Sequence, residues 1–269
     1  MKTPLIGILG GMGPLAAVDL MQKMLEETAA ASDQEQIAVV CWNVPQIPDR
    51  QRALAGIGAS PLPAMLEGIA ALNKAGATRI VVACNTAHYW FDALSAASPA
   101  PLLHIVDATL TMLASPGSVD AADRIGTVGL VATQGTLDAD LYQSRLAAYG
   151  LACIVPDIDA MRLLFTPGCY AIKQGRMSEG AALLHATAQH LVERGAQRLL
   201  LACTEVPLAL SHGNSDLLPI CIDPTRALAR ACAEYWRQAD RGPISHEFPR
   251  PDSGSAPPGS PPHPRADTR

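Results

Sequence analysis

The chain has 269 residues, of which 49% are hydrophobic, 4% aromatic and 17% charged. This composition is typical of globular proteins and excludes a disordered, collagen-like or disulfide-stapled chain. The formal net charge of −5 offers no basic field for nucleic acid, so we expect no nucleic-acid partner. No apolar run approaches the roughly 18 residues of a membrane span, and the first residues lack a signal-peptide pattern. A soluble, cytoplasmic protein without a membrane partner is therefore expected.

Aliphatic runs alternate along the chain with longer stretches rich in Ala and Leu. The predicted strands are Leu5–Leu9, Ile37–Trp42, Arg79–Ala83, Leu102–Val106, Ile125–Val131, Leu151–Val155, Arg198–Ala202 and Leu218–Ile222. The predicted helices are Pro14–Ala30, Leu62–Ala75, Thr136–Tyr149, Ser178–Arg194 and Pro224–Ala239. Continuous apolar strands separated by helices indicate an α/β fold whose parallel sheets are covered on both faces.

Residues 241–269 differ from the rest of the chain, because Pro, Gly and Ser make up about half of them and no apolar periodicity remains. Such a segment cannot bury enough apolar surface to offset its ordering entropy. We predict a disordered tail that follows a folded body of about 240 residues.

A long repeat divides this body. Residues 72–84 and 191–203 share Leu, Gly, Ala, Arg, Ala and Cys, all at an offset of 119, and Asp107–Thr109 recurs at Asp223–Thr225. The period corresponds to a whole α/β domain. The repeat predicts two pseudo-symmetric domains, each a mainly parallel four-stranded sheet flanked by helices, with the active site in the cleft between them. We place the first domain at residues 1–115, completed by a helical segment at about 208–239, and the second at residues 116–207.

Two of the seven cysteines occupy equivalent positions in the repeat, and each follows the last residue of an apolar strand. Cys84 precedes an Asn-Thr pair, and Cys203 precedes a Thr-Glu pair. Because ligands bind at the carboxyl ends of strands in α/β sheets, we expect the two thiols on opposite walls of one cleft. The odd count and the lack of a C-x-x-C pair favour reduced thiols without a metal. The remaining cysteines are interpreted as having no role, four within strand or helix patterns and one in a loop: Cys41, Cys153, Cys221, Cys232 and, in the loop, Cys169.

Two thiols that face each other across a substrate suit inversion of a stereocentre. One thiolate removes a proton from carbon while the other thiol delivers a proton to the opposite face, and no cofactor is needed. The carbanion requires hydrogen-bond donors, which Asn85, Thr86, Thr204 and nearby backbone amides can supply.

Other readings of these residues stay open at this point. The glycines from Gly11 to Gly13 satisfy a dinucleotide-binding pattern, but the second predicted strand ends without an acidic residue for a ribose. His88 follows Cys84 by four residues, on the same face of a helix, and we expect it to have a supporting role, by raising thiolate character or by bonding a Thr or Glu205. As a base it would make Cys84 an acyl-transfer nucleophile and leave Cys203 without a role. A non-catalytic amino-acid-binding module is a further alternative.

An ordered set of motifs carries a family resemblance: Gly7–Pro14, Ile47–Arg50, Cys84–His88, Leu130–Thr136, Ile172–Lys173 with Gly175, and Cys203–Glu205. In these motifs the chain resembles the aspartate/glutamate racemase family, and most closely its aspartate racemase branch, which is independent of pyridoxal phosphate. Maleate isomerases and arylmalonate decarboxylases have a related fold and are the nearest enzymatic alternatives.

The resemblance implies an amino-acid racemase (an isomerase) that interconverts L- and D-aspartate, with glutamate as a second substrate, and that works as a homodimer without a cofactor. It implies that Cys84 and Cys203 are the acid/base groups and that Arg50 and Lys173 hold the substrate carboxylates. It also implies substrate contacts from further residues: Met12, Asn85, Thr86, Thr204 and Glu205. Thr133 and Thr136 are expected either to donate to a carboxylate or to cap a helix that begins near Thr136.

Overall fold

The computed structural model describes residues 4–114 and 126–238. In these residues eight strands form two parallel four-stranded sheets. The first sheet has the order β2-β1-β3-β4 and the second the order β6-β5-β7-β8, so the two halves have the same topology and confirm the predicted duplicated α/β fold. The strands are β1 (Ile6–Gly10), β2 (Val39–Asn43), β3 (Arg79–Val82), β4 (Leu102–Leu103), β5 (Thr127–Leu130), β6 (Ala152–Ile154), β7 (Arg198–Leu200) and β8 (Cys221–Ile222).

Helices cover both faces of the first sheet. Successive β1 side chains point to opposite faces, so neighbouring β1 residues pack into different cores. Ile8 packs into a core shared with α1 (Pro14–Thr28), α5 (Ile105–Ala114) and α12 (Pro224–Gln238). On the opposite face Leu9 packs into a core with α3 (Leu62–Lys74) and α4 (Phe91–Ala96).

The second sheet is covered in the same way. One face packs on α9 (Thr166–Lys173), α10 (Met177–Glu193) and α11 (Glu205–His212), and the other joins the core that contains α7 (Gln143–Ala148). The remaining helices and turns of the described chain are η1 (Asp33–Glu35), α2 (Arg50–Leu54), η2 (Thr86–Trp90), α6 (Gln134–Asp138), α8 (Ile158–Ala160), η3 (Met161–Phe165) and η4 (Leu218–Ile220). None of the helices in the described ranges is both long and apolar enough to span a membrane.

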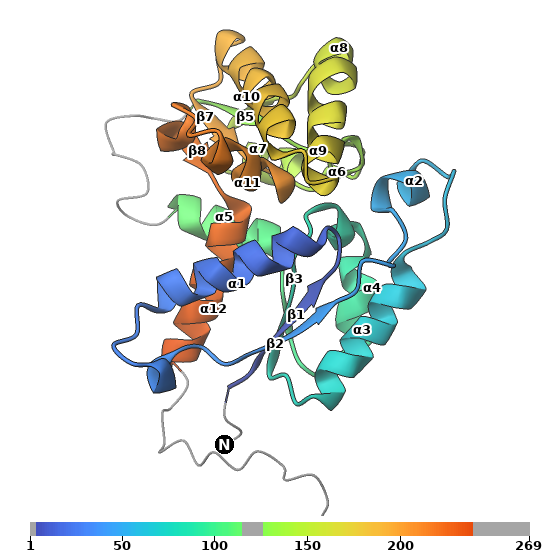
Figure 1. The fold of residues 1–269 in the computed structure, drawn as a ribbon, viewed down its shortest axis with the longest axis vertical. Coiled ribbons are helices and arrows are strands. Elements are labelled where there is room, and N and C mark those ends of the chain that lie inside the picture. The colour runs from blue at the N-terminus through green and yellow to red at the C-terminus, as the bar shows by residue number, and fades with distance from the viewer. Residues whose placement is uncertain (1–3, 115–125, 239–269) are drawn as a thin grey trace, which may run out of the picture. The chain divides into compact units, whose positions relative to one another are not determined.

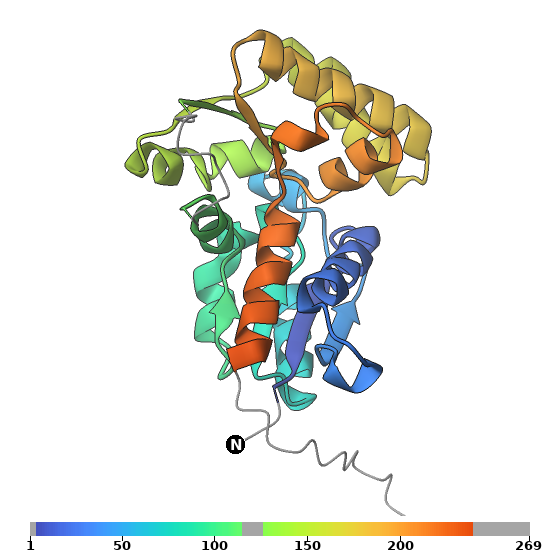
Figure 2. The same ribbon diagram turned by 90° about the vertical axis from the view of Figure 1, so that its left-hand side faces the viewer.

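The chain returns to its first half at the end. After β8, in the second sheet, α12 packs against α1 and α5, and both ribbon views show it beside them (Figures 1 and 2). Arg226 of α12 donates to Glu26 at 2.7 Å and to Glu27 at 3.1 Å, and the Trp236 indole N–H donates to the carbonyl of Glu35 at 3.2 Å. These contacts of α12 are all with the first half. The exact domain boundaries stay a proposal. The predicted tail lies outside the described residues.

Four expectations about the elements are wrong. Ile105 and Val106 begin α5, and residues 218–220 form a turn of 3₁₀ helix, since a short apolar run does not distinguish a strand from a buried helix. The helix predicted over 136–149 is divided into α6 and α7, with Asp140 between them at a φ of 49°. The segment around Cys169 is not a loop but the helix α9.

Candidate active site

One pocket collects residues from the carboxyl ends of both sheets. The pocket is small and part of it is open to solvent. All the predicted site residues line this pocket except Thr136 and His88, and Asp49 and Gln51 line it as well. Most of the residues come from segments that follow the carboxyl ends of parallel strands, and Lys173 is the last residue of α9, so segments far apart in the sequence meet here.

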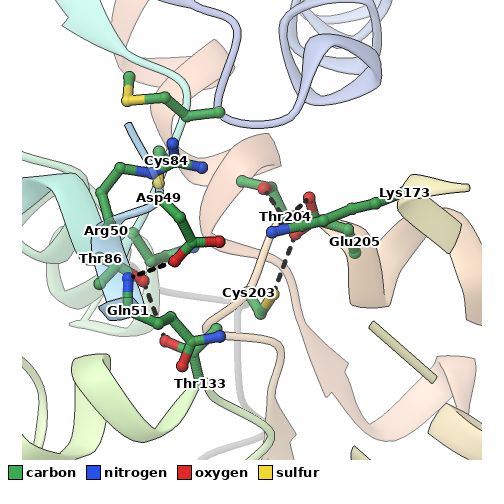
Figure 3. Close-up of a pocket in the computed structure, with 12 residues that line it drawn as sticks. Asp49, Arg50, Gln51, Cys84, Thr86, Thr133, Lys173, Cys203, Thr204 and Glu205 are labelled. Atoms are coloured by element: carbon green, nitrogen blue, oxygen red, sulfur yellow. Dashed lines mark hydrogen bonds and ion pairs between the residues drawn. The ribbon is translucent and has the colours of Figure 1, made fainter. Parts of the chain in front are cut away.

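The two symmetry-related cysteines face the pocket from different sides (Figure 3). Cys84 follows β3 and precedes η2, whereas Cys203 follows β7 and directly precedes Thr204 at the start of α11. Both residues are almost enclosed, with 5% and 4% of their surface exposed. A ligand in this pocket therefore lies between two thiols.

Cys203 is held as a thiol. Its Sγ donates to Glu205 Oε2 at 3.0 Å and lies 3.8 Å from the Sγ of Cys169, which is 1% exposed on α9. The contact with Cys169, burial and the charge of Glu205 raise the pKa of Cys203 well above its usual value, although the nearby ammonium of Lys173 opposes them. Cys169 thus lies on a helix, not in the expected loop, and contacts a pocket thiol.

Glu205 joins this thiol to a cation. Its Oε1 lies 3.8 Å from Lys173 Nζ, and its Oε2 also accepts from Thr204 Oγ1 at 3.3 Å. Burial alone lowers the pKa of Lys173, but the charge of the nearby Glu205 carboxylate more than compensates and raises it, so Lys173 is charged.

The start of α2 supplies a second cation. Arg50 Nη1 donates to the carbonyls of Ile47 and Pro48 at 3.1 and 2.9 Å, while its Nε has no hydrogen-bond partner among the described residues. Asp49 caps the helix by accepting from the backbone N–H of Gln51 and Arg52. Burial raises the pKa of Asp49, but the hydrogen bond from Arg52 and the charges of Lys173 and Arg50 outweigh it, so the pKa is lowered.

Asn85 presents another unused donor. Its Oδ1 accepts from the Tyr142 hydroxyl at 2.6 Å, which fixes the orientation of the amide, and its buried Nδ2 has no partner in the described chain. Buried donors are rarely left unpaired. Asn85 Nδ2 and Arg50 Nε together predict a ligand with acceptor oxygens. No pattern in the sequence indicated Tyr142, which lies 57 positions from its partner.

Three threonines connect the two halves beside Cys84. Thr86 Oγ1 is hydrogen-bonded to Thr133 Oγ1 at 2.9 Å and to Thr136 Oγ1 at 3.0 Å, and the latter two bond each other. Thr133 lines the pocket and also caps α6 by accepting from the Thr136 N–H. Thr136 is completely buried and does not line the pocket, whereas its backbone N–H takes part in the cap of α6, the second of the two expected roles.

His88 is bonded to the backbone on both sides. Ile105 N–H donates to Nε2 at 3.1 Å, so Nδ1 carries the proton that it donates to the carbonyl of Cys84 at 2.8 Å. Burial, aided by the neighbouring His104, lowers the pKa of His88 to about 3. A neutral imidazole with both nitrogens used is no base for Cys84, so the structure gives no support to the acyl-transfer alternative. His88 contacts the backbone of Cys84, and its supporting role stays a prediction.

The glycine loop after β1 is explained by close backbone packing. Gly11 has a φ of 91°, and a Cβ there would lie 2.1 Å from the carbonyl oxygen of Val44. A Cβ on Gly13 would lie 3.3 Å from Glu205 Oε1. The loop thus holds Met12 against the pocket, and its glycines are accounted for without a dinucleotide.

The comparison with known families matches residues 9–232 to the Asp/Glu/Hydantoin racemase family. The chain belongs to this family.

A similar solved structure is the aspartate racemase of Picrophilus torridus. It is 30% identical, the match covers 87% of this chain and 94% of that chain, and the two structures superimpose with a TM-score of 0.75. The broad specificity amino-acid racemase RacX of Bacillus subtilis is 26% identical over 86% of this chain and 98% of its own length. The glutamate racemase of Francisella tularensis, solved with D-glutamate, shares the fold at 17% identity and a TM-score of 0.62, over 87% of this chain and 81% of its own. The protein is therefore a racemase with a small-molecule substrate.

Proposed function

We propose that the protein interconverts L- and D-aspartate by proton transfer at Cα between two thiols, Cys84 and Cys203, without a cofactor. The observation that carries the proposal is the position of these thiols, which come from equivalent points of the repeat and line one pocket from different sides. The resemblance between this chain and an aspartate racemase favours aspartate.

The charges of the pocket match a dicarboxylic amino acid. Arg50 Nε and Asn85 Nδ2 are free to bind one carboxylate, and Lys173 binds the second. Asp49 and Glu205 are positioned to accept from the ammonium group. Together these groups hold Cα between the two sulfur atoms.

The protonation of the thiols sets the direction of the first transfer. Cys203 holds its proton in the free protein, so it donates to Cα while Cys84 accepts the proton from the other face. The C–H bond electrons pass to a carbanion, which the hydrogen bonds to its carboxylate stabilise, and then form the new C–H bond. After one turnover the two thiols have exchanged protonation states, and the enzyme is ready for the opposite enantiomer.

The decisive experiment is incubation of the pure protein with L-aspartate in D₂O. We expect both enantiomers to appear with deuterium at Cα, resolved by chiral chromatography and mass spectrometry. Absence of exchange with both aspartate and glutamate would contradict the proposal.

The roles of the thiols are tested by single variants. Cys84→Ala and Cys203→Ala each remove the acid/base group of one face, so racemisation should fall by about 10² to 10⁴ or more. Cys41→Ala, in β2 and away from the pocket, is the matched control and should retain activity. Wild-type rates in either pocket variant would refute the two-thiol mechanism.

Substrate range is a separate question, because glutamate differs from aspartate by one methylene and pockets discriminate such pairs only by about 1–3 kcal/mol. A relative of this chain is named a broad specificity amino-acid racemase. We expect kcat/KM for aspartate to exceed that for glutamate in a chiral assay over all the protein amino acids. A preference for a non-acidic amino acid would contradict the proposal that Arg50 and Lys173 bind the two carboxylates of the substrate.

We further propose a cytoplasmic homodimer. The cytoplasm is proposed because a reducing compartment keeps both thiols free. The homodimer is proposed because the apolar side chains of Leu15, Val18 and Leu25 are exposed on α1 beside the edge strand β2, where a second chain can cover them. Light scattering should give twice the chain mass of 28.2 kDa.

A further inference from the structure

A third buried group accompanies Cys203 and Glu205 at one end of the pocket. The Sγ atoms of Cys169 and Cys203 and a carboxylate oxygen of Glu205 all lie within 4.8 Å of one another. The proposed racemisation uses Cys203 but has no use for Cys169. Thiolates and carboxylates are also the ligands that zinc accepts.

We propose that Cys169, Cys203 and Glu205 form a binding site for a thiophilic divalent cation, with zinc as the best match, and that the bound cation inhibits the enzyme. Two sulfur atoms on a tetrahedral zinc, each about 2.3 Å from the metal, lie about 3.8 Å apart. The distance between the Cys169 and Cys203 sulfurs is 3.8 Å. Glu205 Oε2, at 3.0 Å from the Cys203 sulfur, needs to turn slightly outward to reach the third corner, about 3.5 Å from that sulfur.

The surroundings allow access and a fourth ligand. Cys203 and Glu205 line the pocket, whereas Cys169 lies behind them on α9. A cation entering from the pocket therefore has one corner open to water or to a substrate carboxylate, as in sites with three protein ligands.

Charge balance also favours a dication. Two thiolates and one carboxylate carry three negative charges, so a divalent cation together with the neighbouring ammonium of Lys173 makes the group neutral. Binding releases the protons of both thiols to solvent, so the affinity rises with pH.

Inhibition follows from the proposed function, on which this part of the inference rests. A zinc-bound Cys203 is a coordinated thiolate, so it has no proton to deliver, and sharing an electron pair with the cation lowers its basicity for proton removal. The cation also occupies the end of the pocket where Lys173 and Glu205 meet the substrate.

Cobalt(II) is the probe, because its thiolate complexes absorb in the near ultraviolet and its tetrahedral sites absorb in the visible. We expect one equivalent to bind the wild-type protein with both bands, and zinc to displace it. Cys169→Ala and Cys203→Ala should each weaken binding at least 10-fold. Cys41→Ala and Cys84→Ala should retain the spectrum, and retention in Cys84→Ala excludes a metal bridged across the pocket by Cys84.

X-ray absorption of the zinc-loaded wild type tests the same site without a variant, and should show two sulfur ligands at about 2.3 Å. Absence of the thiolate band, or an unchanged spectrum in folded Cys169→Ala, would overturn the inference. Both measurements need no substrate, so they decide the metal site even where the racemase assay fails. Where activity is present, zinc should inhibit Cys169→Ala at least 10-fold less than the wild type.

Discussion

Arg50 and Arg52 lie two positions apart on α2 and have contrasting surroundings. Arg50 is 8% exposed, lines the pocket and has a buried Nε without a partner among the described residues. Arg52 is exposed, and its guanidinium donates to the carbonyl of Ile57 at 3.4 Å. Within one short helix, Arg50 is therefore a buried cation that faces the pocket, and Arg52 is a cation exposed to solvent.

Replacing Arg50 should therefore impair turnover. Arg50→Ala removes charged hydrogen bonds to a substrate carboxylate, each typically about 1.5–3 kcal/mol, so kcat/KM for aspartate should fall about 10- to 150-fold. Steady-state kinetics measure the effect, and Arg52→Ala is the control that should stay within twofold of wild type. Equal values for the two variants would place Arg50 outside the site.

Residue identities in the site were predictable where the chain repeats or carries a motif. The repeat alone led to Cys84 and Cys203, and the Asn85–Thr86 and Thr204–Glu205 pairs followed from their position after strands. The contacts of Cys169 and Tyr142 were not predictable, because they depend on how helices of the second half pack against strand ends, and such packing leaves no periodic pattern in the sequence.

At the scale of elements, the two halves repeat even their turn geometry. Gly76 and Gly195, which precede β3 and β7 at equivalent repeat positions, have φ values of 91° and 99°, and nothing lies within 4 Å of a Cβ added to either. Long alternating strands and helices were predictable from the sequence. Short elements such as α2, α4 and η2 were not, because their few residues show no clear period.

Two glycines with the same φ provide a matched test. Gly76→Ala adds only the cost of a left-handed backbone for alanine, so it should destabilise the fold by about 1–2 kcal/mol. Gly11→Ala adds a clash with the Val44 carbonyl and should cost at least about 2 kcal/mol more, with loss of activity as Met12 shifts. Urea denaturation gives both values, and equal costs would show that the Val44 contact does not constrain the loop.

At the scale of the whole molecule, His88 links the stability of the fold to pH. It joins the strand end at Cys84 to the first residue of α5 through two backbone hydrogen bonds. Its pKa in the folded protein is about 3, below the value near 6.5 of an exposed histidine. Between these values the unfolded chain binds a proton that the folded chain does not, so the free energy of unfolding increases with pH.

We expect stability to be lost as the pH falls below about 6.5, with a contribution from His88 of about 1.4 kcal/mol per pH unit. Urea denaturation between pH 5 and 7 measures the slope. His88→Gln preserves a donor and an acceptor but does not titrate, so its slope should be smaller. A wild-type slope in His88→Gln would show that the buried imidazole is not responsible.

The position of α12 has a consequence for how the protein is made. Residues 224–238 complete the apolar face between α1 and α5, although more than a hundred residues of the second half are synthesised in between. During translation the first half leaves the ribosome without the helix that packs against α1 and α5. The order of synthesis therefore delays completion of the first half until the second has emerged, so neither thiol reaches a finished pocket before nearly the whole body has been translated.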